Sequence, residues 1–191
     1  MTTQIVFETH SLTTDNEAGI ATGWLEGQLS EEGRRLARRL GVRRRGERID
    51  AVYTSDLGRA VETAELAFGD GSIPIRQDAR LRECDYGALN GVPVSEVERE
   101  RASRIDEPFP GGESYRQTVE RMRSFLVDVA VEHEPGRIVV IGHSATRWAL
   151  EHLLVGVPLE ELVSAPFEWQ EGWLYELTGA TESIASRSEE T

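Results

Sequence analysis

The sequence predicts an α/β protein, a three-layer sandwich in which helices cover both faces of a mainly parallel central sheet. Short apolar segments typical of buried strands alternate along the chain with longer segments of helical periodicity. The most apolar segment, residues 137–142, shows no alternation of polar and apolar side chains, which is typical of a parallel strand buried on both faces. The length of 191 residues suits one domain, which we expect over residues 1–177, with a polar tail over residues 178–191.

The first expected strand, residues 3–8, leads directly to His10. A polar loop is expected to follow over residues 11–29. Ser30 is the expected N-cap of the first helix, because its hydroxyl can accept from a free backbone N–H, and Gly41 is the expected residue after its end.

The middle of the chain alternates strands and helices. Residues 49–54 and 73–75 are expected strands, and the helix between them carries Arg59 in its first turn. Residues 81–87 have no periodicity and are expected to form a loop, whereas residues 93–104 are expected to form a short polar helix.

The last third opens with a long helix, residues 115–133, for which Ser114 is the expected N-cap. Its apolar positions should form a buried stripe: Val119, Met122, Phe125, Leu126 and Val129. After the strand over residues 137–142, a helix is expected over residues 144–155. The segments 166–169 and 173–177 are expected to pair as a hairpin.

The charge of the chain limits its partners. The formal net charge is -13, with 34 acidic residues against 21 arginines and no lysine. Nucleic acid and anionic membranes bind basic faces, so neither is an expected partner. The arginine-rich run over residues 34–48 is expected to be a solvated helix face. A phosphate substrate would need a locally positive site within this negative protein.

The sequence also predicts the compartment. No run approaches the ~18 apolar residues of a membrane span. The N-terminus lacks the basic and apolar regions of a secretory signal. The single cysteine, Cys84, excludes an internal disulfide and fits a reducing environment. We therefore expect a cytoplasmic protein.

Three residues that suit phosphate chemistry follow the ends of expected parallel strands: His10, Arg59 and His143. Ligands of open parallel sheets bind at this edge, and His143 also precedes an expected helix. Together with the carboxyl group of Glu83, these side chains could transfer a phosphoryl group. A neutral imidazole attacks phosphorus, cationic donors hold its oxygens, and an acid protonates the leaving oxygen.

Other interpretations of the histidines stay open. Either histidine, taken alone, could be a structural residue at a strand end. No His-x-x-x-His or His-x-Asp spacing supports a metal site, and no Gly-x-Ser-x-Gly elbow supports a serine hydrolase.

Several segments match, in order, the motifs of one family. Thr9-His10 and Asn16 keep the spacing of Arg-His-Gly-Glu-Ser/Thr-x-x-Asn, and Ser55-Asp56-Leu57-Gly58-Arg59-Ala60 is close to Ser-x-Leu-x-Arg-Ala. The other matches are Thr22-Gly23-Trp24, Leu29-Ser30-x-x-Gly33, Leu81-x-Glu83-x-x-Tyr86-Gly87, Gly111-Gly112-Glu113-Ser114 and Gly142-His143-Ser144. On these motifs the chain resembles the histidine phosphatase superfamily, which has the phosphoglycerate-mutase-like fold.

The resemblance implies a role for each matched residue. His10 would be the phosphorylated nucleophile, Arg59 and His143 would bind the phosphoryl group, and Glu83 would protonate the leaving group. The residues implied to line the pocket are Asn16, Thr22, Gly23 and Ser144. The implied reaction uses neither a metal ion nor another cofactor.

Two residues depart from the family motif. Thr9 stands where the family has a phosphate-binding arginine, and Ser11 stands where it has a glycine. A threonine hydroxyl cannot replace the bidentate, charge-assisted bonds of a guanidinium, and the loss could cost ~2–4 kcal/mol in the transition state. Arg82 or Arg147, each close in sequence to a retained site residue, could supply the missing charge.

The expected activity is hydrolysis of a small phosphorylated metabolite through a phosphohistidine on His10. Mutase activity is the less expected reaction, because the segment between Gly87 and Gly111 has little insertion that could cover a second phosphate group. Two alternatives stay open: a non-catalytic protein that binds phosphate esters, which Thr9 favours, and an atypical reaction on the same scaffold. Trp169 and Trp173 could lie in the core or in a homodimer interface.

Overall fold

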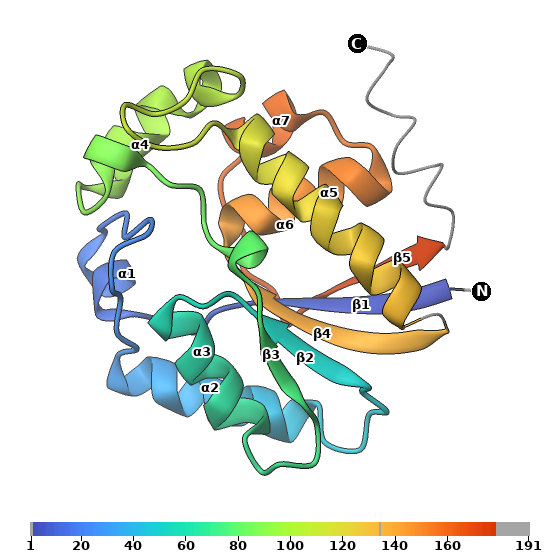
Figure 1. Cartoon of the computed structure of the whole chain (residues 1–191). Coiled ribbons are helices and arrows are strands. Elements are labelled where there is room, and N and C mark those ends of the chain that lie inside the picture. The colour runs from blue at the N-terminus through green and yellow to red at the C-terminus, as the bar shows by residue number, and fades with distance from the viewer. Residues whose placement is uncertain (1, 134, 179–191) are drawn as a thin grey trace.

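The central sheet has five strands in the order β3-β2-β4-β1-β5. The computed structural model describes residues 2–133 and 135–178. The strands are β1 (Thr2–Thr9), β2 (Ala51–Thr54), β3 (Ile75–Gln77), β4 (Gly136–Gly142) and β5 (Trp173–Thr178). Strands β1 to β4 run parallel to one another, and β5 lies antiparallel to β1 at the edge of the sheet (Figure 1).

Helices cover both faces of this sheet. The first face carries α2 (Glu31–Arg43) and α3 (Gly58–Phe68), and the second carries α5 (Tyr115–Glu132) and α6 (Ser144–Leu150) (Figure 1). The remaining helical segments are α1 (Thr14–Ala18), α4 (Val94–Glu100), α7 (Leu159–Ser164), a π-helical turn that continues α6 (Glu151–Val155) and three 3₁₀ turns (Ala79–Leu81, Gly87–Leu89 and Arg101–Arg104). The prediction of a three-layer α/β sandwich is confirmed.

Side chains of the sheet alternate between two apolar cores, one under each helical layer. In β1, Ile5 and Phe7 pack in the core that contains α5 and α6, whereas Val6 packs in the core that contains α2 and α3. Residues 138–141 of β4 contribute to both cores and are fully buried. The continuous apolar sequence of β4 predicts this burial on both faces.

Side-chain caps determine where the two longest helices begin. The Ser30 hydroxyl accepts from the backbone N–H of Gly33 at 3.1 Å, so the predicted N-cap of α2 is confirmed. Ser114 and Gln117 form a reciprocal capping box at the start of α5. The predicted apolar stripe of α5 is buried throughout.

The expected hairpin between residues 166–169 and 173–177 is wrong. Only the second segment forms a strand, and β5 pairs along β1 from Phe7–Trp173 to Thr2–Thr178. This ladder satisfies the exposed edge of β1, which a local hairpin would leave unpaired. Helix α1, five residues long, lies in the expected loop 11–29 and is too short for helical periodicity to show.

Helix α2 continues to Arg43 and does not end at Gly41, as the sequence suggested. Gly41 lies where α2 crosses α3, and a Cβ on it would overlap the carbonyl oxygen of Ala67. This glycine therefore permits close packing of two helices and has no role in helix termination.

Arginines of the 34–48 run form ion pairs with acidic side chains. Arg34 Nε lies 2.6 Å from Glu62 Oε1 on the neighbouring helix. Near the end of α2, Arg43 and Arg44 both reach Glu8 of β1, whose side chain is almost fully buried. The run is thus partly a solvated face and partly an anchor between α2 and the sheet.

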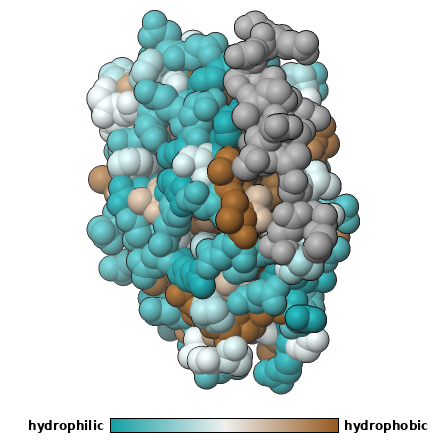
Figure 2. Space-filling model, turned by 45° about the vertical axis from the view of Figure 1, so that its right-hand side comes forward, coloured by the Kyte–Doolittle hydropathy of each residue, from teal (hydrophilic) through white to brown (hydrophobic). Residues whose placement is uncertain are grey.

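Figure 2 shows one face, on which hydrophilic residues dominate. Within residues 2–133 and 135–178, no helix has the length and apolar character needed to cross a bilayer. Thr178 is the last residue of β5, and the rest of the expected tail lies outside the described residues.

A Gly41→Ala substitution tests the crossing of α2 and α3. Alanine is the better helix former, by ~1 kcal/mol. The overlap with Ala67 should nevertheless lower the free energy of unfolding by about 1–3 kcal/mol, measured by urea denaturation.

Gly58→Ala, at the start of α3, is the matched control. Its Cβ would meet nothing closer than 3.4 Å, so its stability should stay the same or rise slightly. A Gly41→Ala protein at least as stable as the wild type would contradict the close crossing.

Candidate active site

Two histidines meet at the carboxyl edge of the sheet. His10 follows β1 and His143 follows β4, and these neighbouring parallel strands end at the same level, with Thr9 opposite Gly142. The backbone N–H of His10 donates to the carbonyl oxygen of Gly142 at 2.9 Å. The centroids of the two imidazole rings lie 5.0 Å apart. A phosphoryl group could therefore contact both rings.

One hydrogen bond determines which nitrogen of His10 is nucleophilic. Nδ1 lies 2.8 Å from the carbonyl oxygen of Ser11. A carbonyl can only accept, so Nδ1 carries the proton and the Nε2 lone pair is free. Ser11 is held on both sides: its N–H donates to Thr63 Oγ1 at 3.0 Å, and its hydroxyl donates to the Gly33 carbonyl at 2.6 Å. These two bonds hold Ser11 in place, and the Ser11 carbonyl in turn orients the ring of His10.

His10 is held in the neutral state. Burial, followed by the nearby Arg59 guanidinium, lowers the pKa of His10 to about 3 from its ordinary value of 6.5. An unprotonated imidazole is the form that can attack phosphorus, so His10 needs no prior deprotonation at neutral pH.

His143 has the opposite proton arrangement. Its Nε2 lies 2.7 Å from Ser55 Oγ, and its Nδ1 lies 3.4 Å from an Arg59 nitrogen that can only donate. Nε2–H therefore donates to Ser55, and Nδ1 faces Arg59 as an acceptor. Burial, then Arg59 and His10, lowers the pKa of His143 well below its ordinary value. A phosphoryl anion between the rings would favour protonation of Nδ1, which could then donate to it.

Arg59 is the buried cation of the site. Its guanidinium donates to the carbonyl oxygens of Gly23 at 2.7 Å and Leu25 at 3.1 Å. Its Nε has no hydrogen-bond partner among the described residues. Burial lowers the pKa of Arg59, although an arginine stays charged in any protein. The 23–25 loop therefore holds a desolvated positive charge beside both histidines.

Glu83 is held at the start of α6, next to His143. Its carboxylate accepts from the backbone N–H groups of Cys84 at 2.9 Å, Ser144 at 3.1 Å and Ala145 at 3.0 Å. The side chain is buried, and these three bonds determine its orientation. The Ser144 amide, expected to face the pocket, therefore serves Glu83 in the unliganded protein.

A cavity of about 540 Å³ lies in front of the histidines. Its lining includes His10 and His143 together with the predicted residues Thr9, Asn16 and Ser144, whereas Arg59 and Glu83 lie beside His143 and do not line it. Asn16 also accepts from the Thr13 N–H at 3.1 Å and thereby caps α1.

Thr22 and Gly23 act on the site from a distance. They do not line the cavity; Thr22 donates to Asp15 at 2.8 Å, and the Gly23 carbonyl binds Arg59. Gly23 has a positive φ of 54°, and a Cβ there would overlap Asn90 Oδ1. The two residues thus shape the loop that holds Arg59.

Arg82 and Arg147, the expected replacements for the motif arginine, lie elsewhere. Arg82 forms a two-bond ion pair with Asp56, at 2.6 and 2.5 Å, and packs over Trp24. Arg147 packs over Trp173 and lies 3.7 Å from Glu151. Neither lines the cavity that contains His10.

Sequence reasoning missed Arg39 and Arg43 of α2, which do line this cavity. The only signal for them is their spacing of four residues, which places them on one face of a helix. No set of three or more His, Cys, Asp and Glu side chains in the described part of the chain is arranged to hold a metal ion.

Comparisons with known proteins show which sequences and folds this chain is similar to. The sequence model of the histidine phosphatase superfamily (branch 1) matches residues 5–185. Phosphoserine phosphatase 1 of Hydrogenobacter thermophilus is 31% identical over 170 residues, covering 84% of this chain and 80% of the relative. A 2,3-bisphosphoglycerate-dependent phosphoglycerate mutase of Methylorubrum extorquens (strain PA1) is 29% identical over 176 residues, covering 84% and 82%. The solved structure of Bacillus stearothermophilus YhfR is similar with a TM-score of 0.83 and 29% identity, covering 94% and 93%.

The neutral state of His10 should make stability depend on pH. In the unfolded chain, His10 takes up a proton as the pH falls below its ordinary pKa of 6.5. In the folded protein, His10 stays unprotonated until about pH 3. The contribution of His10 to the free energy of unfolding is thus fully present above pH 6.5. It decreases as the pH falls, by at most ~1.4 kcal/mol per pH unit. Between about pH 6 and pH 5, His10→Asn should lose about 1 kcal/mol less stability than the wild type, measured by urea denaturation.

Equal losses in the two proteins would contradict a buried, neutral His10. The comparison of variant with wild type removes the contribution of the carboxyl groups, which titrate in both.

Proposed function

The chain belongs to the histidine phosphatase superfamily, and from that premise we propose that it hydrolyses a small phosphomonoester through a phosphohistidine intermediate on His10. The observation that carries the proposal is the hydrogen bond from His10 Nδ1 to the Ser11 carbonyl. It leaves Nε2 unprotonated in a cavity that His143 shares. Relatives named as phosphatases support hydrolysis, and other relatives are named as phosphoglycerate mutases.

In the first step, the Nε2 lone pair of His10 forms a bond to phosphorus as the bond from phosphorus to the ester oxygen breaks. Arg59 and a protonated His143 stabilise the charge on the phosphoryl oxygens. In this step Glu83 acts in its acid form, with a proton on its carboxyl group. Glu83 then gives this proton to the leaving oxygen.

In the second step, water attacks phosphorus and the phosphorus–nitrogen bond breaks. The Glu83 carboxylate takes a proton from the attacking water, which restores its acid form. Because Nδ1 of His10 keeps its proton throughout, the phosphorylated ring is cationic and is a good leaving group. Inorganic phosphate leaves, and His10 returns to the neutral state.

Thr9 decides how this site differs from its family. Its hydroxyl can give one neutral hydrogen bond where the motif arginine gives two charged ones, so Arg59 and a His143 protonated beside the phosphoryl group would stabilise the negative charge without it. We propose weaker binding of inorganic phosphate as a consequence. The same substitution supports a second candidate function, non-catalytic binding of a phosphate ester, and leaves room for an atypical reaction on this scaffold.

The proposal extends to partners and location. The substrate would be a small phosphorylated metabolite, used without a metal ion and without nucleic acid or membrane partners. Cys84 is free and buried, and burial raises its pKa, which suits an inert thiol in a reducing cytoplasm. The exposed Trp169 is available for a homodimer contact, whereas Trp173 packs edge-on against Phe7.

A His10→Asn variant tests the nucleophile. Turnover of 4-nitrophenyl phosphate should persist in the presence of a chelator and fall to background in the variant, because no other lone pair lies in front of phosphorus. Wild-type protein quenched during turnover should carry phosphate that is stable in alkali and labile in acid, detected by ³¹P NMR.

His152→Asn is the matched control, because His152 lies outside the cavity and bonds to the Val157 carbonyl. It should keep full activity. Turnover by His10→Asn would contradict the mechanism. Tight binding of phosphate esters without turnover by the wild type would support the non-catalytic alternative.

A Glu83→Gln variant tests the proton donor. Hydrolysis of an alkyl phosphate should slow by about 10²–10⁴-fold, because an alkoxide is a poor leaving group without a proton. Hydrolysis of 4-nitrophenyl phosphate should slow far less, since nitrophenolate leaves unprotonated. Equal losses for the two esters, measured as kcat/KM, would assign Glu83 a purely structural role.

A further inference from the structure

We propose that the cavity continues beyond the phosphoryl position as a subsite for an uncharged aromatic group of the substrate. This apolar subsite lies between α2 and residues 165–172, the segment that connects α7 to β5. The proposal rests on the phosphatase function and adds the chemical class of the ester's organic group.

The cavity is larger than a phosphoryl group alone would need. Its volume of about 540 Å³ is in the ~300–1,000 Å³ range of pockets that hold whole small molecules. The two histidines account for only part of its lining. A phosphoryl group held between the rings leaves most of the cavity for the rest of the substrate.

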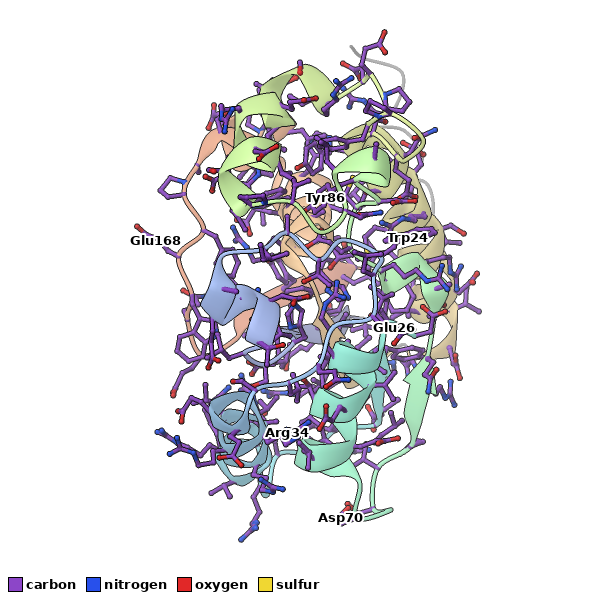
Figure 3. All side chains as sticks on the ribbon, turned by 90° about the vertical axis from the view of Figure 1, so that its left-hand side faces the viewer. Trp24, Glu26, Arg34, Asp70, Tyr86 and Glu168 are labelled. Atoms are coloured by element: carbon purple, nitrogen blue, oxygen red, sulfur yellow. The ribbon has the colours of Figure 1, made fainter. Side chains whose placement is uncertain are left out.

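The two long walls of the cavity are apolar. Leu36, Ala37 and Leu40 of α2 form one wall. Phe167 and Trp169 form the other, although they are 38% and 58% exposed. Glu168, between them in sequence, points outward at the edge of the molecule (Figure 3). Exposed aromatic side chains that border a catalytic cavity bury the most apolar surface when a flat apolar ligand stacks against them.

Thr9 connects this subsite to the catalytic end. It lines the cavity beside His10, on the strand that leads to the histidine. An arginine at this position would extend several more atoms and a charge into the same space. The substitution that removes a phosphate contact therefore opens a path for an organic group from His10 towards the 165–172 segment.

The carboxylates that line the cavity are paired with arginines. Glu8 and Glu171 line it together with Arg39 and Arg43. Arg43 lies 3.1 Å from Glu8 and 3.6 Å from Glu171, so both carboxylates are paired. Arg39 is exposed and has no hydrogen-bond or ion-pair partner among the described residues. Arg44, outside the cavity, also pairs with Glu8, at 2.6 Å, so the two carboxylates leave no unpaired negative charge to oppose an apolar group.

Two esters with the same leaving oxygen test the subsite: ethyl phosphate and 2-(2-naphthyl)ethyl phosphate. Both release a primary alcohol, so a difference in kcat/KM reports binding of the aromatic group in the transition state. The wild type should prefer the naphthyl ester by about 10–100-fold. Trp169→Ala should lower kcat/KM for the naphthyl ester about 10-fold more than for ethyl phosphate.

Thr9→Arg should reverse the preference, because the longer side chain fills the path while its charge binds the phosphoryl group. Leu174→Ala is the control: Leu174 is 61% exposed and outside the cavity, so its removal should leave both substrates unaffected. Equal kcat/KM values for the two esters in the wild type would overturn the subsite and leave the phosphatase function intact.

If neither ester is turned over, the phosphatase function fails and the subsite is still tested by binding. Calorimetry with 2-(2-naphthyl)ethylphosphonate and ethylphosphonate replaces the kinetic comparison. Tighter binding of the naphthyl compound, lost in Trp169→Ala, supports the subsite. Equal binding of the two phosphonates overturns it.

Discussion

The parallel pairing of β1 with β4 is the constraint on which the site depends. It sets Thr9 opposite Gly142, so the residues that follow, His10 and His143, come within 5.0 Å of one another. A slip of one residue would turn every side chain of β1 to the other face of the sheet and separate the rings. The ion pairs of Glu8 with Arg43 and Arg44 oppose such a slip, because it would turn this carboxylate towards the core beneath α5 and α6.

Around this pair, one buried charge has two functions. Burial and then the charge of Arg59 lower the pKa of both imidazoles in the empty site, and in the proposed reaction the same charge stabilises the phosphoryl group. That arrangement places local positive charge inside a chain with a net charge of -13. In the proposed reaction, Thr9 takes the place of a second cation. The apolar walls of the cavity then offer binding energy to the organic part of the ester in place of its phosphate.

Patterns local in sequence were enough for the sheet, the N-caps at Ser30 and Ser114, and the meeting of the two histidines. Features that depend on contacts between residues far apart in the sequence could not be predicted from such patterns. Gly41 resembles a helix end in sequence, yet it serves a crossing between helices that only the packed structure reveals. The 165–172 segment shows no periodicity that would place Trp169 over the cavity. Arg39 and Arg43 gave only a four-residue spacing, and the packing of α2 determines where that helix face points.

The most direct test of the central claim is the protonation of His10 in the unliganded protein. ¹⁵N-edited NMR of the histidine rings at pH 7 and pH 5, assigned with a His10→Asn variant, distinguishes the two tautomers and the imidazolium. The hydrogen bond to the Ser11 carbonyl and the pKa of about 3 predict a neutral ring with its proton on Nδ1 at both pH values. A proton on Nε2, or a charged ring at pH 5, would contradict His10 as a nucleophile poised to attack phosphorus.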